Sequence, residues 1–222
     1  MTHSLNTLLR RSLHVGLVAA ASFGAACVVG HGTVAASEAE LPVNALAPEI
    51  TASADAAVAA LIAFEATGDP ADERLLAFHR ATTARYTAQQ LGYDELAMID
   101  AWSTTTLDHQ RAVLGALTQV GVPYRTNTSI EGEGFDCSGL TYYAWAGAGL
   151  ELYRQSGSQI SESKRLDREE AKAGDLVHYP GHVMLYLGVD DAVVHSVNTG
   201  RTVEVDTMTR SNVSFGDPTI SD

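Results

Sequence analysis

Hydrophobic positions between residues 51 and 102 recur every three or four residues, which is the period of helices buried along one side. Gly68 and Pro70 divide this stretch into two helices, because glycine favours a helix end and proline fits a first helical turn. Gly92 ends the second helix, and a third, shorter helix is expected after it. Residues 37–50 contain two prolines without a clear period and are interpreted as a linker.

After residues 37–102, the linker and helical region, the pattern changes to helices mixed with short strands over residues 103–210. A helix is expected over residues 108–119, another directly after Asp136, and a polar loop over residues 155–164. Four short apolar runs then predict antiparallel strands, at residues 175–179, 182–188, 192–196 and 202–205. The second of these runs is apolar on both faces and is predicted to be a central strand. Helices followed by antiparallel strands are typical of an α+β fold.

The N-terminus has the pattern of an export signal. The Arg10–Arg11 pair precedes an apolar run over residues 13–29, and small residues ending at Ala36 offer a cleavage site. A membrane span is the weaker alternative, because the run is rich in Gly and Ala and shorter than the ~20 strongly apolar residues that a span needs. Residues 1–36 therefore predict a protein that is secreted, extracellular or cell-wall associated, with no stable membrane insertion after cleavage. Lipidation at Cys27 is an alternative anchor.

Composition narrows the class of protein. The 222 residues include 27 acidic and 14 basic ones, and the net charge of −13 argues against nucleic-acid binding. Two cysteines exclude a disulfide framework and a zinc finger. Hydrophobic residues make up 45%, so most of the chain can form a packed core. Residues 211–222 are interpreted as a C-terminal tail.

Cys137 is the candidate for chemistry. It is expected at the N-terminus of the helix after Asp136, where the helix dipole favours an anion such as a thiolate. Asp136 opposes ionisation of the thiol, so its carboxylate is better explained as a helix cap or as a receiver for a cationic substrate group. A lone cysteine without further context is more often a buried structural residue.

Two histidines favour a catalytic role of Cys137 over a structural one, because a cysteine nucleophile needs an imidazole base and a third group to orient that base. His182 begins the central strand and His195 lies in the next one. A four-residue loop between these strands would place the two histidines on one face as diagonal neighbours, whereas a three-residue loop would place them on opposite faces. His178 is an alternative base.

Other candidates have simpler explanations. His178 and His182 are too far apart along a strand, at about 13 Å, to share one metal ion, so no metal site is predicted. His79 and His109 are expected on helix surfaces. Arg154 is interpreted as a structural ion-pairing residue.

At these residues the chain resembles the NlpC-type family of bacterial cell-wall cysteine peptidases, over about residues 108–208. The resemblance rests on the joint order and spacing of several short motifs, none of them specific alone. They are Gly121-Val122-Pro123-Tyr124, Phe135-Asp136-Cys137-Ser138-Gly139-Leu140, Leu152-Tyr153-Arg154-Gln155-Ser156 with Gln159, Gly174-Asp175-Leu176-Val177, His182-Val183 with Tyr186-Leu187-Gly188, and His195. It implies a papain-like α+β fold with an antiparallel sheet, preceded here by the small helical region.

The resemblance also implies roles for individual residues. Cys137 would be the nucleophile, His182 the base and His195 its orienter. Tyr124 would assist on the oxyanion or substrate side, and Asp136 with Ser138 would hold the amino group of a short peptide. The implied substrate is the peptide stem of peptidoglycan, cut between D-glutamate and the diamino acid, without a metal or organic cofactor.

One departure from the usual family sequence leaves the identity of the substrate open. Residues 125–129 replace the aromatic residue and two glycines that usually follow the Pro-Tyr pair, and this loop borders the expected substrate groove. A related thiol amidase or transferase acting on another amide, or a non-catalytic wall-binding module, are the alternatives. The helical region carries no motif and is expected to space or cover the catalytic part.

Overall fold

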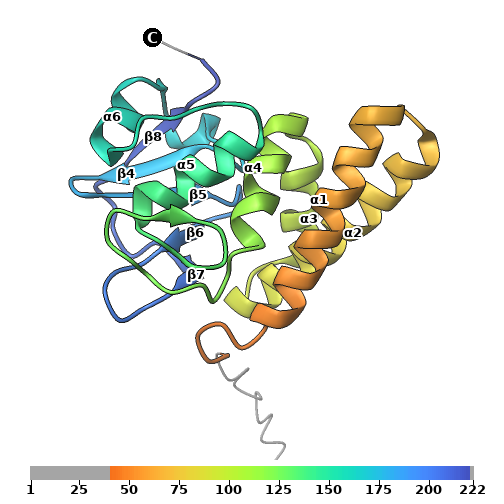
Figure 1. The fold of residues 1–222 in the computed structure, drawn as a ribbon, viewed down its shortest axis with the longest axis horizontal. Helices are drawn as coiled ribbons and strands as arrows, with labels where there is room; N and C mark the ends of the chain where they lie inside the picture. Colours follow the sequence, from red (N-terminus) through yellow and green to blue (C-terminus); the bar gives the residue numbers. More distant parts are fainter. Residues whose placement is uncertain (1–40, 221–222) are drawn as a thin grey trace, which may run out of the picture. The chain divides into compact units, whose positions relative to one another are not determined.

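The computed structural model describes residues 41–220 and shows a group of helices followed by an antiparallel sheet (Figure 1). All of the described residues belong to one compact unit. The predicted export signal, with Cys27, lies outside the described residues. The α+β fold expected from the sequence is therefore confirmed.

Three helices form the N-terminal helical region, as the apolar period predicts. They are α1 (Ala47–Thr67), α2 (Pro70–Leu91) and α3 (Glu95–Ser103). The side chain of Asp69 caps α2 and that of Asp94 caps α3, each accepting a hydrogen bond from a first-turn N–H. The predicted linker is too long, since α1 already begins at Ala47. Pro48 in its first turn is compatible with a helix, because the N–H that proline lacks has no helical partner there.

Helix α1 is long and apolar enough to span a membrane by length and composition alone. It packs against α2 and against α4 (Leu107–Leu117). Ile50, Ala54 and Leu61 of α1 are fully buried in the main core. In the described structure one face of α1 therefore lies in the core.

Two further helices lie near the sheet. Helix α5 (Cys137–Gly147) packs against α4 and the sheet, as Figure 1 shows. Helix α6 (Ser156–Ser161) occupies the segment predicted to be a polar loop, so that prediction is wrong. The buried amide of Gln159 explains the helix, because its Nε2 donates to the carbonyls of Tyr153 and Ser138 and ties this polar segment to α5.

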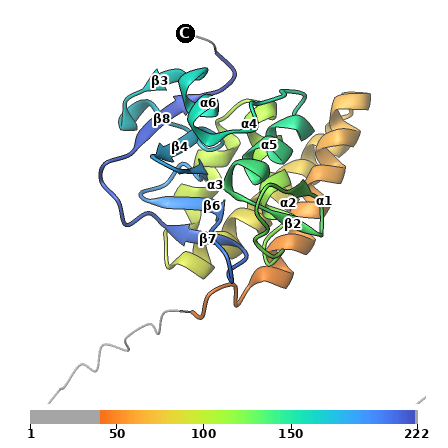
Figure 2. The ribbon, with the colours of Figure 1, turned by 60° about the vertical axis from the view of Figure 1, so that its left-hand side comes forward.

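Six strands form the main sheet in the order β3-β8-β4-β5-β6-β7, with all neighbours antiparallel (Figure 2). Strand β5 is an interior strand, as predicted. The strands are β3 (Lys164–Leu166), β4 (Leu176–Tyr179), β5 (His182–Tyr186), β6 (Ala192–Ser196), β7 (Val203–Thr207) and β8 (Ser214–Asp217). A separate two-stranded sheet pairs β1 (Ser129–Ile130) with β2 (Gly134–Phe135).

Strand β8 corrects the interpretation of residues 211–222 as a tail. It lies between β3 and β4 and pairs with both. Phe215 of β8 is buried and packs edge-on against Tyr186 with 5.5 Å between ring centroids. The C-terminal segment therefore completes the sheet.

Alternating side chains give the sheet two apolar faces. One face joins the helices in the main core, through residues such as Leu185 and Val194. The other face carries a smaller cluster that includes Met184, Tyr186 and Val193. This alternation fixes the register of each strand, because a shift of one residue would exchange the faces.

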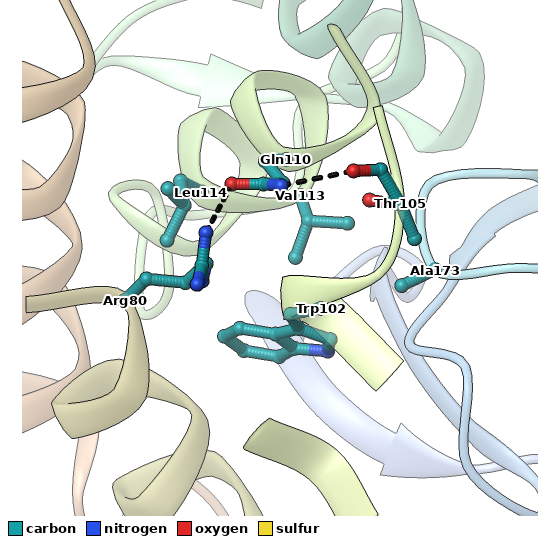
Figure 3. Close-up of a pocket in the computed structure, with 7 residues that line it drawn as sticks. All are labelled: Arg80, Trp102, Thr105, Gln110, Val113, Leu114 and Ala173. Atoms are coloured by element: carbon teal, nitrogen blue, oxygen red, sulfur yellow. Dashed lines mark hydrogen bonds between the residues drawn. The ribbon is translucent and has the colours of Figure 1, made fainter. Parts of the chain in front are cut away.

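Trp102 at the end of α3 joins the helical region to the sheet. Its side chain is 1% exposed, and its Nε1–H donates to the carbonyl of Leu187 at 2.8 Å. Figure 3 shows Trp102 beside a tightly packed site where Arg80 of α2 donates to the side chain of Gln110 of α4. Helices α2, α3 and α4 are thus held against each other by buried contacts.

Candidate active site

His182 and His195 are in direct contact. A hydrogen bond of 2.8 Å joins His182 Nε2 to His195 Nδ1. Leu187 N–H donates to the carbonyl of Ala192, so the loop between β5 and β6 has the four residues that bring the two histidines onto one face. The structure therefore has the four-residue alternative, and it shows the contact that this alternative permits.

Asp206 of β7 extends this pair, and the sequence analysis did not single it out. Its Oδ2 lies 3.5 Å from His195 Nε2, just beyond an ordinary hydrogen bond. The interaction with His195 is the main cause that lowers the pKa of Asp206 from its ordinary value, and the Thr207 N–H contributes. An ionised carboxylate only accepts hydrogen bonds, so it favours a proton on His195 Nε2.

The order His182–His195–Asp206 therefore determines which ring nitrogen of each histidine carries the proton. With its proton on Nε2, His195 presents an unprotonated Nδ1 that accepts from the Nε2–H of His182. Neutral His182 then keeps the lone pair on its own Nδ1. That nitrogen is the one suited to take a proton from a nucleophile.

Burial makes His182 a weakly basic group. The side chain is 8% exposed, and desolvation is the largest cause that lowers its pKa to about 4. The neighbouring His195, His178 and Arg210 lower the pKa further. At neutral pH His182 is therefore unprotonated, which is the state that a general base requires.

This pKa predicts the acid limb of the pH profile. We expect kcat/KM for the proposed peptide hydrolysis to rise with pH through a midpoint near 4 and to be flat at neutral pH, because His182 loses its proton there. The measurement is kcat/KM from about pH 3 to about pH 9, with circular dichroism at each pH to exclude unfolding. An acid limb centred on the ordinary histidine value of ~6.5 would contradict this description of the site.

Cys137 is the first residue of α5, as expected. Asp136 caps the helix, and its Oδ1 accepts from the Gly139 N–H at 2.7 Å. Within residues 41–220, the N–H of Cys137 donates to no other group, as is usual in a first helical turn. The helix thus presents a half-buried thiol and an unpaired backbone donor at the same end.

Arg154 forms a two-pronged ion pair with Asp136, with 2.8 Å from Nη1 to Oδ1 and from Nη2 to Oδ2. The remaining acceptor positions of Asp136 take the N–H groups of Gly139 and Asn127. A carboxylate offers about four such positions. Asp136 is thus fully used in holding the loop before Cys137, which leaves no free lone pair for a substrate amino group. The structural interpretation of Arg154 is confirmed.

Ser138 belongs to the same network, since its Oγ accepts from Arg154 at 2.9 Å and lies 3.4 Å from Asp136 Oδ1. The sequence analysis grouped Ser138 with Asp136, and the structure brings them together with Arg154 between them.

An open groove of about 460 Å³ contains these residues. The residues that line it are Tyr124, Asn127, Asp136, Cys137, Ser138, Arg154, Gln155, Ser156, Gly157 and Gly181. Gly181, which directly precedes His182 in the chain, also lines this groove. All lining residues follow Pro123, so the helical region contributes no wall to the groove.

Tyr124 is suited to donate a hydrogen bond in the groove. Burial raises the pKa of its phenol, and the nearby Cys137 and Asp136 raise it further. The phenol therefore keeps its proton at neutral and mildly alkaline pH. Asn127 belongs to the unusual loop after Tyr124 and lines the groove. Its backbone φ is 56°.

His109 was predicted to lie on the surface, and this is wrong. It is 4% exposed, and its ring lies between Thr106 Oγ1 at 2.7 Å and Asp175 Oδ1 at 3.1 Å. Asp217 is also near, and these three ionisable residues could surround a cation. Protein hydrogen bonds already use them, since Asp175 accepts from Lys172 N–H and Asp217 from Thr219. We interpret the cluster as a structural link between α4 and the sheet.

Comparison with known proteins identifies this part of the chain. Residues 121–215 match the family model described as the NlpC/P60 family. Through these residues the chain belongs to the NlpC/P60 family. The matched region contains Cys137, His182, His195 and Asp206.

Two curated relatives are named as peptidases. The peptidoglycan endopeptidase RipB of Mycobacterium tuberculosis is 40% identical over 100 residues, covering 38% of this chain and 42% of RipB. The γ-D-glutamyl-L-lysine dipeptidyl-peptidase of Bacillus subtilis is 34% identical over 100 residues, covering 41% of this chain and 33% of that protein. The chain thus spans less than half the length of these curated relatives.

Solved structures include one member without activity. RipD of Mycobacterium tuberculosis, described as a non-catalytic NlpC/p60 domain protein adapted to peptidoglycan binding, is 30% identical, with a TM-score of 0.43. The match covers 50% of this chain and 98% of that one.

Proposed function

We propose that this protein is a cysteine peptidase that hydrolyses peptide stems of peptidoglycan. The observation that carries the proposal is the combination of Cys137, at a helix N-terminus in an open groove, with the His182–His195–Asp206 chain, which begins one residue after Gly181 of that groove. Each part supplies one requirement of nucleophilic catalysis: the nucleophile, its base and the group that orients the base. The name of RipB, a peptidoglycan endopeptidase, supports peptidoglycan as the substrate.

In the first step Cys137 Sγ attacks the carbonyl carbon of the scissile amide, and His182 Nδ1 takes the thiol proton. The carbonyl oxygen becomes an anion, stabilised by the unpaired N–H of Cys137 and by the phenol of Tyr124. His195 accepts the Nε2–H of His182 while the imidazolium exists, and Asp206 supports His195.

The second step breaks the C–N bond. The imidazolium of His182 gives its proton to the leaving nitrogen, so the amine departs and a thioester to Cys137 remains. Neutral His182 then takes a proton from water as the water attacks the thioester. Collapse of that intermediate releases the acid and returns the proton to sulfur.

We further propose that the bond cut lies between D-glutamate and the diamino acid, and that residues 103–210 are the catalytic domain. The name of the Bacillus subtilis relative, a γ-D-glutamyl-L-lysine dipeptidyl-peptidase, supports this bond. Residues 1–36 are proposed to export the protein to the cell wall, where its substrate is found.

The test uses the purified protein from residue 37 onward and the tripeptide L-Ala-γ-D-Glu-meso-diaminopimelate, with products identified by mass spectrometry. Release of the dipeptide L-Ala-D-Glu by the wild type, and none by Cys137→Ala, is the expected result. Cleavage of another amide in a peptide panel would instead assign a different substrate. Saturable binding of peptidoglycan without turnover, unchanged in Cys137→Ala, would overturn the proposal in favour of a wall-binding module.

Replacing Asp206 with asparagine should lower kcat about tenfold and leave KM nearly unchanged, as for outer groups that orient a catalytic histidine. An amide can donate as well as accept, so it no longer fixes the proton of His195 on Nε2. The acid limb of the pH profile should also move to lower pH, because a negative charge that favours the His182 imidazolium is lost.

The control for this variant is Asp100→Asn on the exposed surface of α3, which removes the same charge elsewhere. Nitrogen-15 NMR of the histidine rings reports the tautomer of His195 directly. An Asp206→Asn protein with wild-type kcat, pH profile and ring spectrum would exclude Asp206 from the site.

A further inference from the structure

A second hollow lies on the other side of the turn that joins β4 to β5. It has a volume of about 490 Å³ and is lined by Tyr179, Pro180, Thr209, Arg210, Ser211 and Asn212. Pro180 belongs to this hollow, whereas the adjacent Gly181 lines the groove of Cys137. The two depressions are therefore neighbours across the turn that leads into His182.

Stacked side chains connect the hollow to His182. The ring of Tyr179 stacks on that of His182, with 5.2 Å between centroids and 29° between planes. The guanidinium carbon of Arg210 lies 4.4 Å above the centre of the Tyr179 ring. Arg210 is also near enough to contribute to the low pKa of His182. A smaller hollow, lined by Tyr179 and Arg210, continues to His195 and Asp206.

The residues that line this hollow carry one positive charge and no negative charge. The chain has 27 acidic residues, but none of the six residues that line the hollow is acidic. Among the described residues, Arg210 has no carboxylate within ion-pair distance, as is also true of Arg74, Arg125 and Arg165, so its guanidinium is free to bind an anion. The neighbouring side chains of Ser211 and Asn212 also make no hydrogen bond within residues 41–220. The hollow thus offers several unpaired donors around one positive charge.

We propose that Arg210, lying over Tyr179, binds a carboxylate on the leaving-group side of the scissile bond. This inference rests on the proposed peptidase function and names a feature of the substrate. The acyl part of the substrate would occupy the groove of Cys137, and the leaving amine would extend past His182 toward Arg210. The two stacked contacts measure 5.2 Å and 4.4 Å, and an extended chain advances about 3.5 Å per residue, so Arg210 lies within reach of the second or third leaving residue or of a long acidic side chain on the first.

Electrostatics supports this placement. A guanidinium binds a carboxylate through parallel N–H···O bonds, and stacking on an aromatic ring holds its plane in position. The bound carboxylate would also offset the positive charge of Arg210 near His182. Since that charge lowers the pKa of His182, a substrate with the carboxylate would favour the imidazolium that must form during attack.

Two carboxylates of a diamino-diacid leaving group could fill this role, one on its main chain and one at the end of its side chain. The experiment compares the tripeptide L-Ala-γ-D-Glu-meso-diaminopimelate with its two mono-amides, using wild type, Arg210→Gln and the matched control Arg74→Gln. Arg74 lies on the exposed surface of α2, so its replacement removes one positive charge away from the groove.

Amidation of the recognised carboxylate should lower kcat/KM about tenfold or more for wild type and Arg74→Gln, and less than about twofold for Arg210→Gln, as expected for a charge-assisted hydrogen bond. The mono-amide that shows the loss identifies the carboxylate. Equal discrimination by wild type and Arg210→Gln, or none by wild type, would overturn the proposal.

A binding measurement distinguishes failure of this inference from failure of the proposed peptidase function. In the Cys137→Ala background, the affinity for the same three peptides is measured by calorimetry with Arg210 present and with Arg210→Gln. Binding that depends on both the carboxylate and Arg210, without any turnover in the wild type, would retain the subsite and reject the peptidase. Turnover by wild type with affinities and rates independent of Arg210 would retain the peptidase and reject the subsite.

Discussion

The variant His182→Gln is expected to lower kcat/KM for stem-peptide hydrolysis about 10²- to 10⁴-fold, which is the usual contribution of a general acid–base residue. Glutamine fills a similar space and can still hydrogen bond to His195, but it cannot carry a proton from Cys137 to the leaving nitrogen. Steady-state kinetics with the tripeptide measures the loss. Circular dichroism and a thermal melt show whether the variant remains folded.

The matched control is His178→Gln on the neighbouring strand β4. His178 lies opposite Val183 in the β4–β5 pair and is half-buried, and the sequence left it open as an alternative base. We expect its replacement to change kcat/KM by less than about threefold, because it makes no hydrogen bond to His182 or His195 within the described part of the chain. A large loss in His178→Gln with activity retained in His182→Gln would reverse the assignment of the base.

The variant Trp102→Ala is expected to reduce the free energy of unfolding by about 3–5 kcal/mol, as for other fully buried aromatic residues. The indole is 1% exposed, and its loss would also leave the Leu187 carbonyl without its donor. For a protein of this size the melting temperature should fall by roughly 6–20 °C. Urea unfolding at constant pH gives the free-energy change directly.

Leu96→Ala on the same helix is the control for this measurement. Leu96 is 76% exposed, so its replacement should change stability by less than about 0.5 kcal/mol. Equal effects of the two variants would show that the helical region is not energetically coupled to the sheet. The expected difference would show that the contact of α3 with the sheet through Trp102 stabilises the fold that carries the groove.

The sequence predicted the features that depend on local rules. The four-residue loop after β5 sets the register of the hairpin, and counting along the sequence permitted the contact between His182 and His195 without selecting that loop length. Asp136 is a strong helix-capping residue, so the start of α5 at Cys137 followed from the sequence. The helix ends at Gly68 and Gly92 have the left-handed backbone that glycine favours.

Features that depend on long-range packing were missed. Helix α4 lies between α1 on one side and α5 on another, so it is buried around most of its surface. A one-sided helical pattern therefore placed His109 wrongly on the surface. Strand β8 is short, contains Gly216 and pairs with two strands distant in sequence, so no alternation identified it.

Asp206 shows a similar limit at the site. Its alignment with His195 depends on the pairing of β6 with β7 across an irregular loop, where His195 lies opposite Glu204. The sequence alone presents several acidic residues near this strand, with nothing to select one. Once the pairing of His195 with Glu204 is known, Asp206 can be identified, because it lies two residues after Glu204 on the same face of β7.

The central claim is that Cys137 forms a covalent acyl intermediate, and rapid acid quenching followed by intact-protein mass spectrometry tests it most directly. Wild-type protein mixed with the stem tripeptide should gain the mass of the L-Ala-D-Glu acyl group on Cys137 and lose it as product accumulates. Cys137→Ala should show neither the adduct nor the product. Continued release of L-Ala-D-Glu by Cys137→Ala would contradict the account.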